Sequence, residues 1–381
     1  MDISKKLNWQ NIFIFLFLIL FPFGQIIRIG IIQPIDFVVG GAAVYSIIFK
    51  LKEPKIFQHF KNFLYIAVFT YVLAIFIFWS KDIGVGLLYL FRLIAYFYFL
   101  VYVWNFASTK TNRDLLMNSL TSLSLISSLF GWIQYLTFPD LKPFFVYGWD
   151  MHLFRVVGTF LDPTFLGLII VFGLLILIYR SIGKWNWKNI LLILFLLISL
   201  AFTYSRGSYL AFLTGMLLIG YYSKEIKKLL LLSVGLIALV VLLPTSRNHS
   251  IELLRSFSAI ARVDNYIETL KVAKIFPVFG VGYDNICLAR QKFIGAESFS
   301  SHACSGSDSS LLLVLATTGI LGMFSFIYLI IQIWKKSNIL FKILLVSLFV
   351  HSLFSNSLFY PWIIGYYFIL LAVSLRTEVE S

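Results

Sequence analysis

Long apolar runs alternate with short polar connections along the whole chain. The runs are roughly 16 to 22 residues long, which is the length that an α-helix needs to cross the hydrocarbon core of a bilayer. The pattern predicts an all-α, polytopic integral membrane protein, a single helical domain over 1–381 with about twelve transmembrane helices. The predicted spans are 10–27, 34–50, 62–80, 84–105, 114–137, 162–180, 189–204, 207–222, 229–243, 309–333, 339–356 and 359–375. A large loop, 244–308, separates the ninth span from the tenth.

Composition agrees with a membrane protein. Of the 381 residues 60% are hydrophobic and only 13% are charged, whereas about a quarter of a soluble protein is charged. The formal net charge of +14 comes from lysines and arginines spread over the short loops, not gathered on one basic face. The excess therefore reflects membrane topology, and nucleic acid is excluded as a partner.

Alternate loops differ in their content of basic residues, which sets the predicted orientation. The basic loops carry Lys5, Lys6, Lys50, Lys52, Lys55, Lys61, Lys110, Arg113, Arg180, Lys184, Lys188, Lys224, Lys227, Lys228, Lys335, Lys336, Lys342 and Arg376. By the positive-inside rule these loops and both termini are cytoplasmic. The 139–161 and 244–308 loops then lie on the outer face.

The stretch "AFTYSRGSYLAF", 201–212, places an arginine between two apolar runs. Lys188 and Lys224 are both assigned to the cytoplasm, and one helix between them would be about 50 Å long, too long for a core of about 30 Å. Two short spans with a break at Ser205-Arg206-Gly207 are therefore predicted. Arg206 then lies near the outer interface, either reaching to lipid phosphates or contributing to an anion site that faces the bundle.

Other polar residues gather on the same predicted face. In "FRVVGTFLDPTFLG", Asp162 and Pro163 are typical of the N-cap and first position of a helix. Arg155 then lies near the mouth of that helix, where an anion can bind. Tyr204, next to the predicted break, is a further candidate for substrate contact.

The 244–308 loop is predicted to contain an amphipathic helix or helix pair over 251–276, ended by Pro277. Arg255 and Arg262 are seven residues apart and so share a face. The loop is either an interfacial helix resting on lipid or a lid over an external cavity. Cys287 and Cys304, the only cysteines, either form a disulfide or remain free thiols.

The candidate catalytic residues lie at the end of this loop and inside one span. His302 can act as a general base, and Asp308 has the same option beside a simpler role as a helix N-cap. Acids of the loop such as Glu252 and Asp264 are alternatives. Arg92 lies in the middle of a predicted span, where a charged residue is costly and therefore indicates a functional role. The histidines show no metal-ligand spacing, so no metal site is predicted.

Four segments together resemble the O-antigen ligase and O-antigen polymerase superfamily of bacterial envelope proteins. They are "RVVGTFLDPTFLG", "TYSRGSYLAF", "FPVFGVGYDN" and "SDSSLLLVLATTGILG". The resemblance covers 155–323 and implies a glycosyltransferase on the outer face of the bacterial cytoplasmic membrane. Such an enzyme transfers a glycan from a polyprenyl diphosphate to a hydroxyl. It is inverting, metal-independent and without a cofactor.

The resemblance also implies residue roles. The family's diphosphate-binding arginines map to Arg206, Arg155 and Arg262, and Arg92, Arg255 and Tyr204 are further candidates for substrate contact. The family's His-Asn before the final span is Ser307-Asp308 here, and its Pro-Asn is Pro163-Thr164. The first departure leaves the catalytic base open between His302 and Asp308, and it favours a polymerase over a ligase.

Three alternatives to a polymerase are open. The first is an O-antigen ligase, which transfers the glycan to lipid A core or another acceptor. The second is a transporter with Arg92 and Arg206 along a permeation path, although no internal repeat is seen. The third is a structural membrane protein, in which Arg206→Lys would be harmless. Expected partners are the lipid-linked glycan and membrane lipids, with chain-length regulators and flippases as candidate protein partners.

Overall fold

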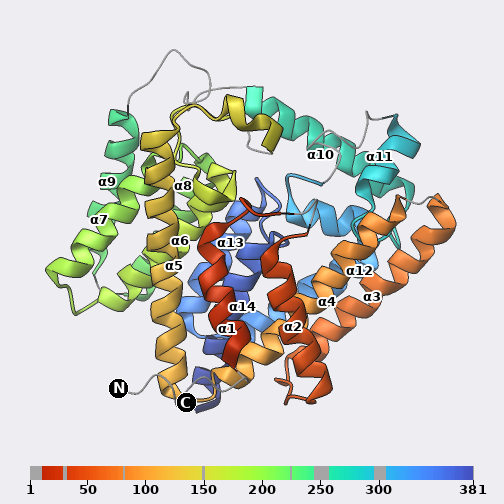
Figure 1. The fold of residues 1–381 in the computed structure, drawn as a ribbon, viewed down its shortest axis with the longest axis horizontal. Helices are drawn as coiled ribbons and strands as arrows, with labels where there is room; N and C mark the ends of the chain where they lie inside the picture. Colours follow the sequence, from red (N-terminus) through yellow and green to blue (C-terminus); the bar gives the residue numbers. More distant parts are fainter. Residues whose placement is uncertain are drawn as a thin grey trace. The chain divides into compact units, whose positions relative to one another are not determined.

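The computed structural model describes residues 11–28, 32–79, 82–147, 151–223, 225–243, 257–295 and 306–380. In these ranges the protein is almost entirely helical (Figure 1), with fourteen α-helices and one isolated bridge between Asp140 and Leu153. The helices are α1 (Ile12–Leu20), α2 (Pro34–Ile48), α3 (Phe57–Phe78), α4 (Ile83–Phe106), α5 (Lys110–Thr137), α6 (Pro163–Ser181), α7 (Trp187–Ala201), α8 (Arg206–Tyr222), α9 (Ile226–Leu242), α10 (Phe257–Ile275), α11 (Ile286–Ile294), α12 (Ser310–Lys336), α13 (Ile339–Ser352) and α14 (Pro361–Glu380). Short 3-10 helices are Phe21–Phe23, Lys142–Tyr147 and Gly158–Phe160.

The predicted spans coincide with helices α1–α9 and α12–α14, and α10 and α11 lie in the predicted large loop. Within the described ranges, five helices are long and apolar enough to cross a membrane: α3, α4, α5, α6 and α12. Shorter apolar helices include Ile12–Phe23, α2, α7 and α13. The protein is therefore an all-α, multi-pass membrane protein. The count of twelve crossings and the orientation stay predictions.

The chain forms two compact units, each assembled from three separate segments. Unit 1 comprises Met1–Val38, Thr109–Arg255 and Asn338–His351, and unit 2 comprises Val39–Ser108, Ser256–Ser337 and Ser352–Ser381. The prediction of one helical domain with an inserted outer loop is not tested by this division.

In unit 1 the most buried helix is α6, which packs against α5, α7 and α8. Close approach of α5 and α6 depends on small residues, because a side chain on Gly173 would collide with Ser124. The Ser124 hydroxyl also donates a hydrogen bond of 2.8 Å to the Ile169 carbonyl. Small residues and interhelical hydrogen bonds of this kind are typical of helix packing within membranes.

The predicted break between two short spans is confirmed. α7 ends at Ala201 and α8 begins at Arg206, with the Ser205 side chain capping α8 by accepting a bond from the Ser208 N–H. The two helices contain 15 and 17 residues. At 1.5 Å per residue they are about 22 and 25 Å long, each shorter than a typical bilayer core.

The predicted N-cap of α6 is also confirmed. Asp162 has extended backbone dihedrals, and its carboxylate accepts a hydrogen bond of 2.6 Å from the Thr164 N–H. Pro163 occupies the first helical position. The backbone N–H at that position has no acceptor within the helix, so proline, which lacks an N–H, loses no hydrogen bond there.

We expect Asp162→Ala to lower the free energy of unfolding by about 1 kcal/mol, because it removes this cap. Asp162→Asn should leave stability unchanged, since asparagine caps equally well. Thermal unfolding of the purified protein in detergent measures both. If Asp162→Asn abolished activity at full stability, Asp162 would have a chemical role beyond capping.

In unit 2, α12 is interrupted at Gly319, whose φ of 67° and ψ of −168° are not helical. A Cβ atom on Gly319 would lie 2.2 Å from the Val278 carbonyl oxygen, so no other residue fits without movement of the backbone. The interruption lies nine residues after Ser310, about 14 Å along the helix. An interruption at this depth frees backbone groups that need partners.

A segment of the predicted large loop supplies these partners. We call residues 277–285, between α10 and α11, the inserted segment. Its hydrogen bonds to α12 run from Val281 N to Ala316 O (3.0 Å), from Gly282 N to Thr317 O (2.9 Å), and from Ile320 N to Pro277 O (2.9 Å). Gly280 and Gly282 both have a positive φ, which allows the segment to turn tightly at these two residues. Irregular backbone is thus enclosed by protein, as membrane proteins require.

Cys287, in α11, is disulfide-bonded. The chain has one other cysteine, Cys304, which lies outside the described residues.

Candidate functional site

In unit 1, the side chain of Arg155 stabilises the turn that leads into α8 by hydrogen bonds to its backbone. Its side chain is 3% exposed, and its Nε and Nη2 donate hydrogen bonds to the carbonyls of Thr203 (2.9 Å) and Tyr204 (3.0 Å). Its Nη1 lies 3.4 Å from Nδ1 of His152. The guanidinium therefore has a structural role, and its predicted role as a diphosphate ligand stays a prediction.

Arg206 is the first residue of α8 and is half-buried. Tyr204, two residues before Arg206, is buried and has a positive φ of 50°, an uncommon conformation for a bulky residue. The hydrogen bond from Arg155 holds that strained turn. Arg206 thus lies at a helix N-terminus, where free N–H groups and the helix dipole favour an anion.

A buried hydrogen-bonded chain lies beside Arg206. Oγ of Ser208 lies 2.8 Å from Oγ of Ser205 and 3.3 Å from Nε2 of His351. His351 is fully buried in the last turn of α13, and Ser208 also contacts the Thr164 carbonyl in α6 at 3.2 Å. Three helices of unit 1 therefore converge on the N-terminus of α8. Sequence reasoning missed His351, which is 143 residues from Ser208.

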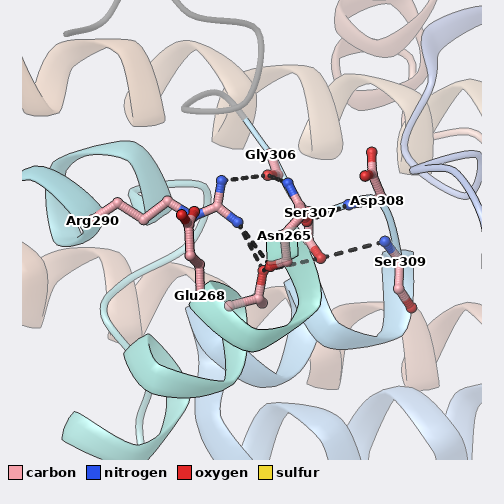
Figure 2. Close-up of polar contacts among 8 residues, drawn as sticks. Asn265, Glu268, Arg290, Gly306, Ser307, Asp308 and Ser309 are labelled. Atoms are coloured by element: carbon pink, nitrogen blue, oxygen red, sulfur yellow. Dashed lines mark hydrogen bonds and ion pairs between the residues drawn. The ribbon is translucent and has the colours of Figure 1, made fainter. Parts of the chain in front are cut away.

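In unit 2, the side chain of Arg290 connects α10, α11 and the segment before α12 (Figure 2). It is fully buried; Nη1 donates to the Gly306 carbonyl at 3.0 Å, and Nη2 donates to the Asn265 carbonyl at 3.3 Å and to Oγ1 of Thr269 at 2.8 Å. Nε lies 3.7 Å from Oε2 of Glu268. Burial lowers the pKa of Arg290, and nearby carboxylates oppose this shift. Sequence reasoning did not select Arg290.

Asp308 is held in the same cluster. Its N–H donates a hydrogen bond of 3.0 Å to Oδ1 of Asn265, and its carboxylate lies within electrostatic range of Arg290. The simpler role considered for Asp308, the N-cap of α12, is wrong, because Ser309 is the capping residue and accepts from the Leu312 N–H. Asp308 thus precedes the cap, and its proposed catalytic role is not tested.

Arg262 lies in α10 one turn before Tyr266 and is half-buried. Burial raises the pKa of the Tyr266 hydroxyl; Arg262 opposes the rise and Asp308 adds to it. Arg262 and Asp308, far apart in sequence, therefore act on one tyrosine. Within unit 2, one predicted phosphate ligand (Arg262) and one candidate general base (Asp308) therefore lie near the same side chain.

Residues 190–327 match the family model described as O-antigen ligase. This range runs from α7 into α12 and contains Arg206, Arg262, Arg290 and Asp308. Residues 190–327 form an O-antigen ligase family domain. The resemblance seen in the sequence is confirmed there, whereas Arg155 precedes the matched residues. The matched residues make up a little over a third of the chain. No curated protein matches the chain.

Two predicted site residues of the O-antigen ligase family domain, His302 and Arg255, lie outside the described residues, so their roles stay predictions. Arg92, which precedes the domain, is half-buried in α4 with its guanidinium 5.1 Å from the ring centre of Tyr89. In the described ranges no group of three or more His, Cys, Asp or Glu side chains is arranged to hold a metal ion.

Proposed function

We propose that the protein polymerises polyprenyl-diphosphate-linked oligosaccharide repeat units on the outer face of the bacterial cytoplasmic membrane. The observation that carries this proposal is Arg206 at the N-terminus of α8, inside an O-antigen ligase family domain. The products would be O-antigen, capsule or exopolysaccharide chains. The reaction is inverting, without a metal or other cofactor.

The chemistry of the leaving group supports this role of Arg206. When the glycosidic carbon leaves the carrier, negative charge develops on the diphosphate. A guanidinium and the free N–H groups of a helix N-terminus stabilise that charge without rearranging, and they act most strongly where water is scarce. Arginine suits two phosphate oxygens better than lysine does, because its planar fork donates two parallel bonds. Arg155 contributes by fixing the turn before α8.

A feature of unit 2 favours a polymerase over a ligase. Ser307-Asp308 occupies the position at which ligases of the resembled superfamily carry His-Asn. The Ser307 hydroxyl accepts a bond of 3.3 Å from Oγ1 of Thr269 and another of 3.3 Å from the Ser309 N–H. This position therefore serves the packing of α10 against α12. Arg262 is assigned to the phosphates, with Arg255, Arg92 and Tyr204 as further contacts to the substrate.

In this proposal both termini are cytoplasmic and the glycan is handled outside, so the substrate arrives after its carrier has been flipped. Flippases and chain-length regulators are then natural neighbours in the membrane. The proton of the attacking sugar hydroxyl needs a base, for which the sequence offers His302 and Asp308.

The deciding experiment incubates the purified protein in lipid nanodiscs with a polyprenyl-diphosphate repeat unit and separates the products by size. A ladder of repeat lengths is expected. A single transfer to added lipid A core would establish the ligase instead. Absence of transfer, together with uptake of solute into proteoliposomes, would establish the transporter.

A further inference from the structure

The side chain of His351 reaches from α13 to the first turn of α8 inside unit 1. His351 is fully buried, and its Nε2 lies 3.3 Å from Oγ of Ser208, the third residue of α8. Glycines make room for this contact. A Cβ on Gly167 of α6 would lie 2.4 Å from Oγ of Ser208. One on Gly215 of α8 would lie 2.7 Å from Oγ of Ser347, one turn before His351. The close packing of α8 against α6 and α13 therefore encloses a polar contact at the start of α8.

The hydroxyl of Ser208 has three hydrogen-bond partners and a single hydrogen. The partners are Oγ of Ser205 at 2.8 Å, Nε2 of His351 at 3.3 Å and the Thr164 carbonyl at 3.2 Å. A carbonyl can only accept, so the hydrogen of Ser208 is directed to Thr164, and the two lone pairs of its oxygen accept from Ser205 and His351. This arrangement requires a hydrogen on Nε2 of His351. His351 is thus the donor at the end of the chain, and a residue that replaces it must also donate.

The bond from His351 helps to fix the turn that carries Arg206. The cap of α8 is weak by itself, because the Ser208 N–H lies 3.4 Å from Oγ of Ser205, beyond the usual range of about 2.7–3.2 Å. The shorter bond between the two hydroxyls supplements the cap, and His351 holds Ser208 in place. On the preceding side, Arg155 holds the turn by hydrogen bonds to two backbone carbonyls. The backbone of Arg206 is therefore fixed from both sides.

We propose that His351 is a positioning residue for glycan transfer, which holds the first turn of α8 so that the guanidinium of Arg206 meets the charge that develops on the diphosphate. The inference rests on the proposed function and concerns the same site. His351 acts through Ser208 and takes no part in the bond changes. Its effect is large because a group that stabilises transition-state charge must be in place beforehand, and a displacement of about 1 Å can lower the rate about 10²-fold.

His351→Leu tests this role, because it removes the donor and keeps a side chain that can fill the space between the helices. We expect kcat for glycan transfer to fall about 10²-fold with little change in KM. The melting temperature should not fall, since the Ser208 hydroxyl keeps its bonds to Ser205 and Thr164. His351→Gln should recover most of the rate, because the glutamine amide can donate to Ser208 as the imidazole does. Steady-state kinetics in lipid nanodiscs and thermal unfolding measure these effects.

Two further variants distinguish positioning from a general loss of packing. The matched control is Ser347→Ala, one turn earlier on α13, where a buried hydroxyl donates only within its own helix, to the Ile343 carbonyl at 3.1 Å. This control should transfer glycan as the wild type does. The second is the double variant of His351→Leu with Arg206→Ala. It should be no slower than Arg206→Ala alone, because the group that His351 positions is already absent.

The outcomes separate this inference from the proposed function. If the wild type transfers no glycan, the proposed function fails and the positioning role fails with it. If the wild type transfers glycan and His351→Leu keeps its kcat, the positioning role alone is overturned. It is also overturned if His351→Gln is as slow as His351→Leu, or if the double variant is slower than Arg206→Ala. A lower melting temperature for His351→Leu would make His351 a structural residue.

Discussion

Replacing Arg206 with alanine should abolish glycan chain extension in a protein that is still folded and inserted. Loss of one preorganised group that stabilises developing charge typically lowers kcat roughly 10²–10³-fold, about 3–4 kcal/mol in the transition state. Stability should not fall, because a cation at a helix N-terminus opposes the helix dipole and its removal relieves that repulsion. The size distribution of the polymer and thermal unfolding in detergent measure the two effects.

Variants beside Arg206→Ala separate charge from geometry. Arg206→Lys should retain only part of the activity, because an ammonium group lacks the planar fork that matches phosphate oxygens. The control is Arg180→Ala, at the exposed C-terminal end of α6, which should extend chains normally. Polymer of near-normal length from Arg206→Ala would remove Arg206 from the mechanism and favour a lipid-facing, structural role.

Arg290→Met should have the largest effect on stability. The guanidinium of Arg290 is buried among the carbonyls of Gly306 and Asn265, the Thr269 hydroxyl and the Glu268 carboxylate. Removing one member of such a buried charged network costs about 3–5 kcal/mol, because its partners lose their bonds without regaining water. The melting temperature should fall and α10 should become accessible to protease. Glycan transfer should be lost as a consequence.

Lys271→Ala, on the exposed face of α10, is the matched control and should change stability by less than about 0.5 kcal/mol. The stability of Arg290→Lys should lie between those of the wild type and Arg290→Met, since lysine retains the positive charge but not the planar guanidinium group. If Arg290→Met unfolded at the wild-type temperature and still lost activity, Arg290 would act on the substrate and not on the packing of α10 and α11.

The membrane helices and the cap of α6 were predictable because their signals are local. The length of an apolar run determines a span, and the capping residue Asp162 directly precedes its helix. The break at Arg206 followed from the same arithmetic of helix length and bilayer thickness. The N-cap of α12 was placed one residue too early, because aspartate and serine are equally good caps and Asp308 stands next to Ser309.

The remaining site features depend on contacts between distant segments, which periodicity does not reveal. Arg290 lies in a short polar helix, α11, so its sequence context indicates a surface residue. In the folded unit it is buried, enclosed by α10 and Gly306. The same holds for His351, which ends an ordinary apolar helix and meets Ser208 only in the folded unit. The interruption at Gly319 was missed because apolar residues continue on both sides of it. A glycine in such a run can lie within a regular helix or interrupt it, and the sequence does not show which.

The docking of the inserted segment against α12 has a consequence for biogenesis. A transmembrane helix normally enters the bilayer complete, since all its amides are paired within it. The turn of α12 around Gly319 is instead closed by 277–282, which leaves the ribosome shortly before α12 itself. In the proposed orientation, that stretch must be exported before α12 can insert stably. A truncated chain lacking it would present bare amides to lipid and be a target for membrane proteases.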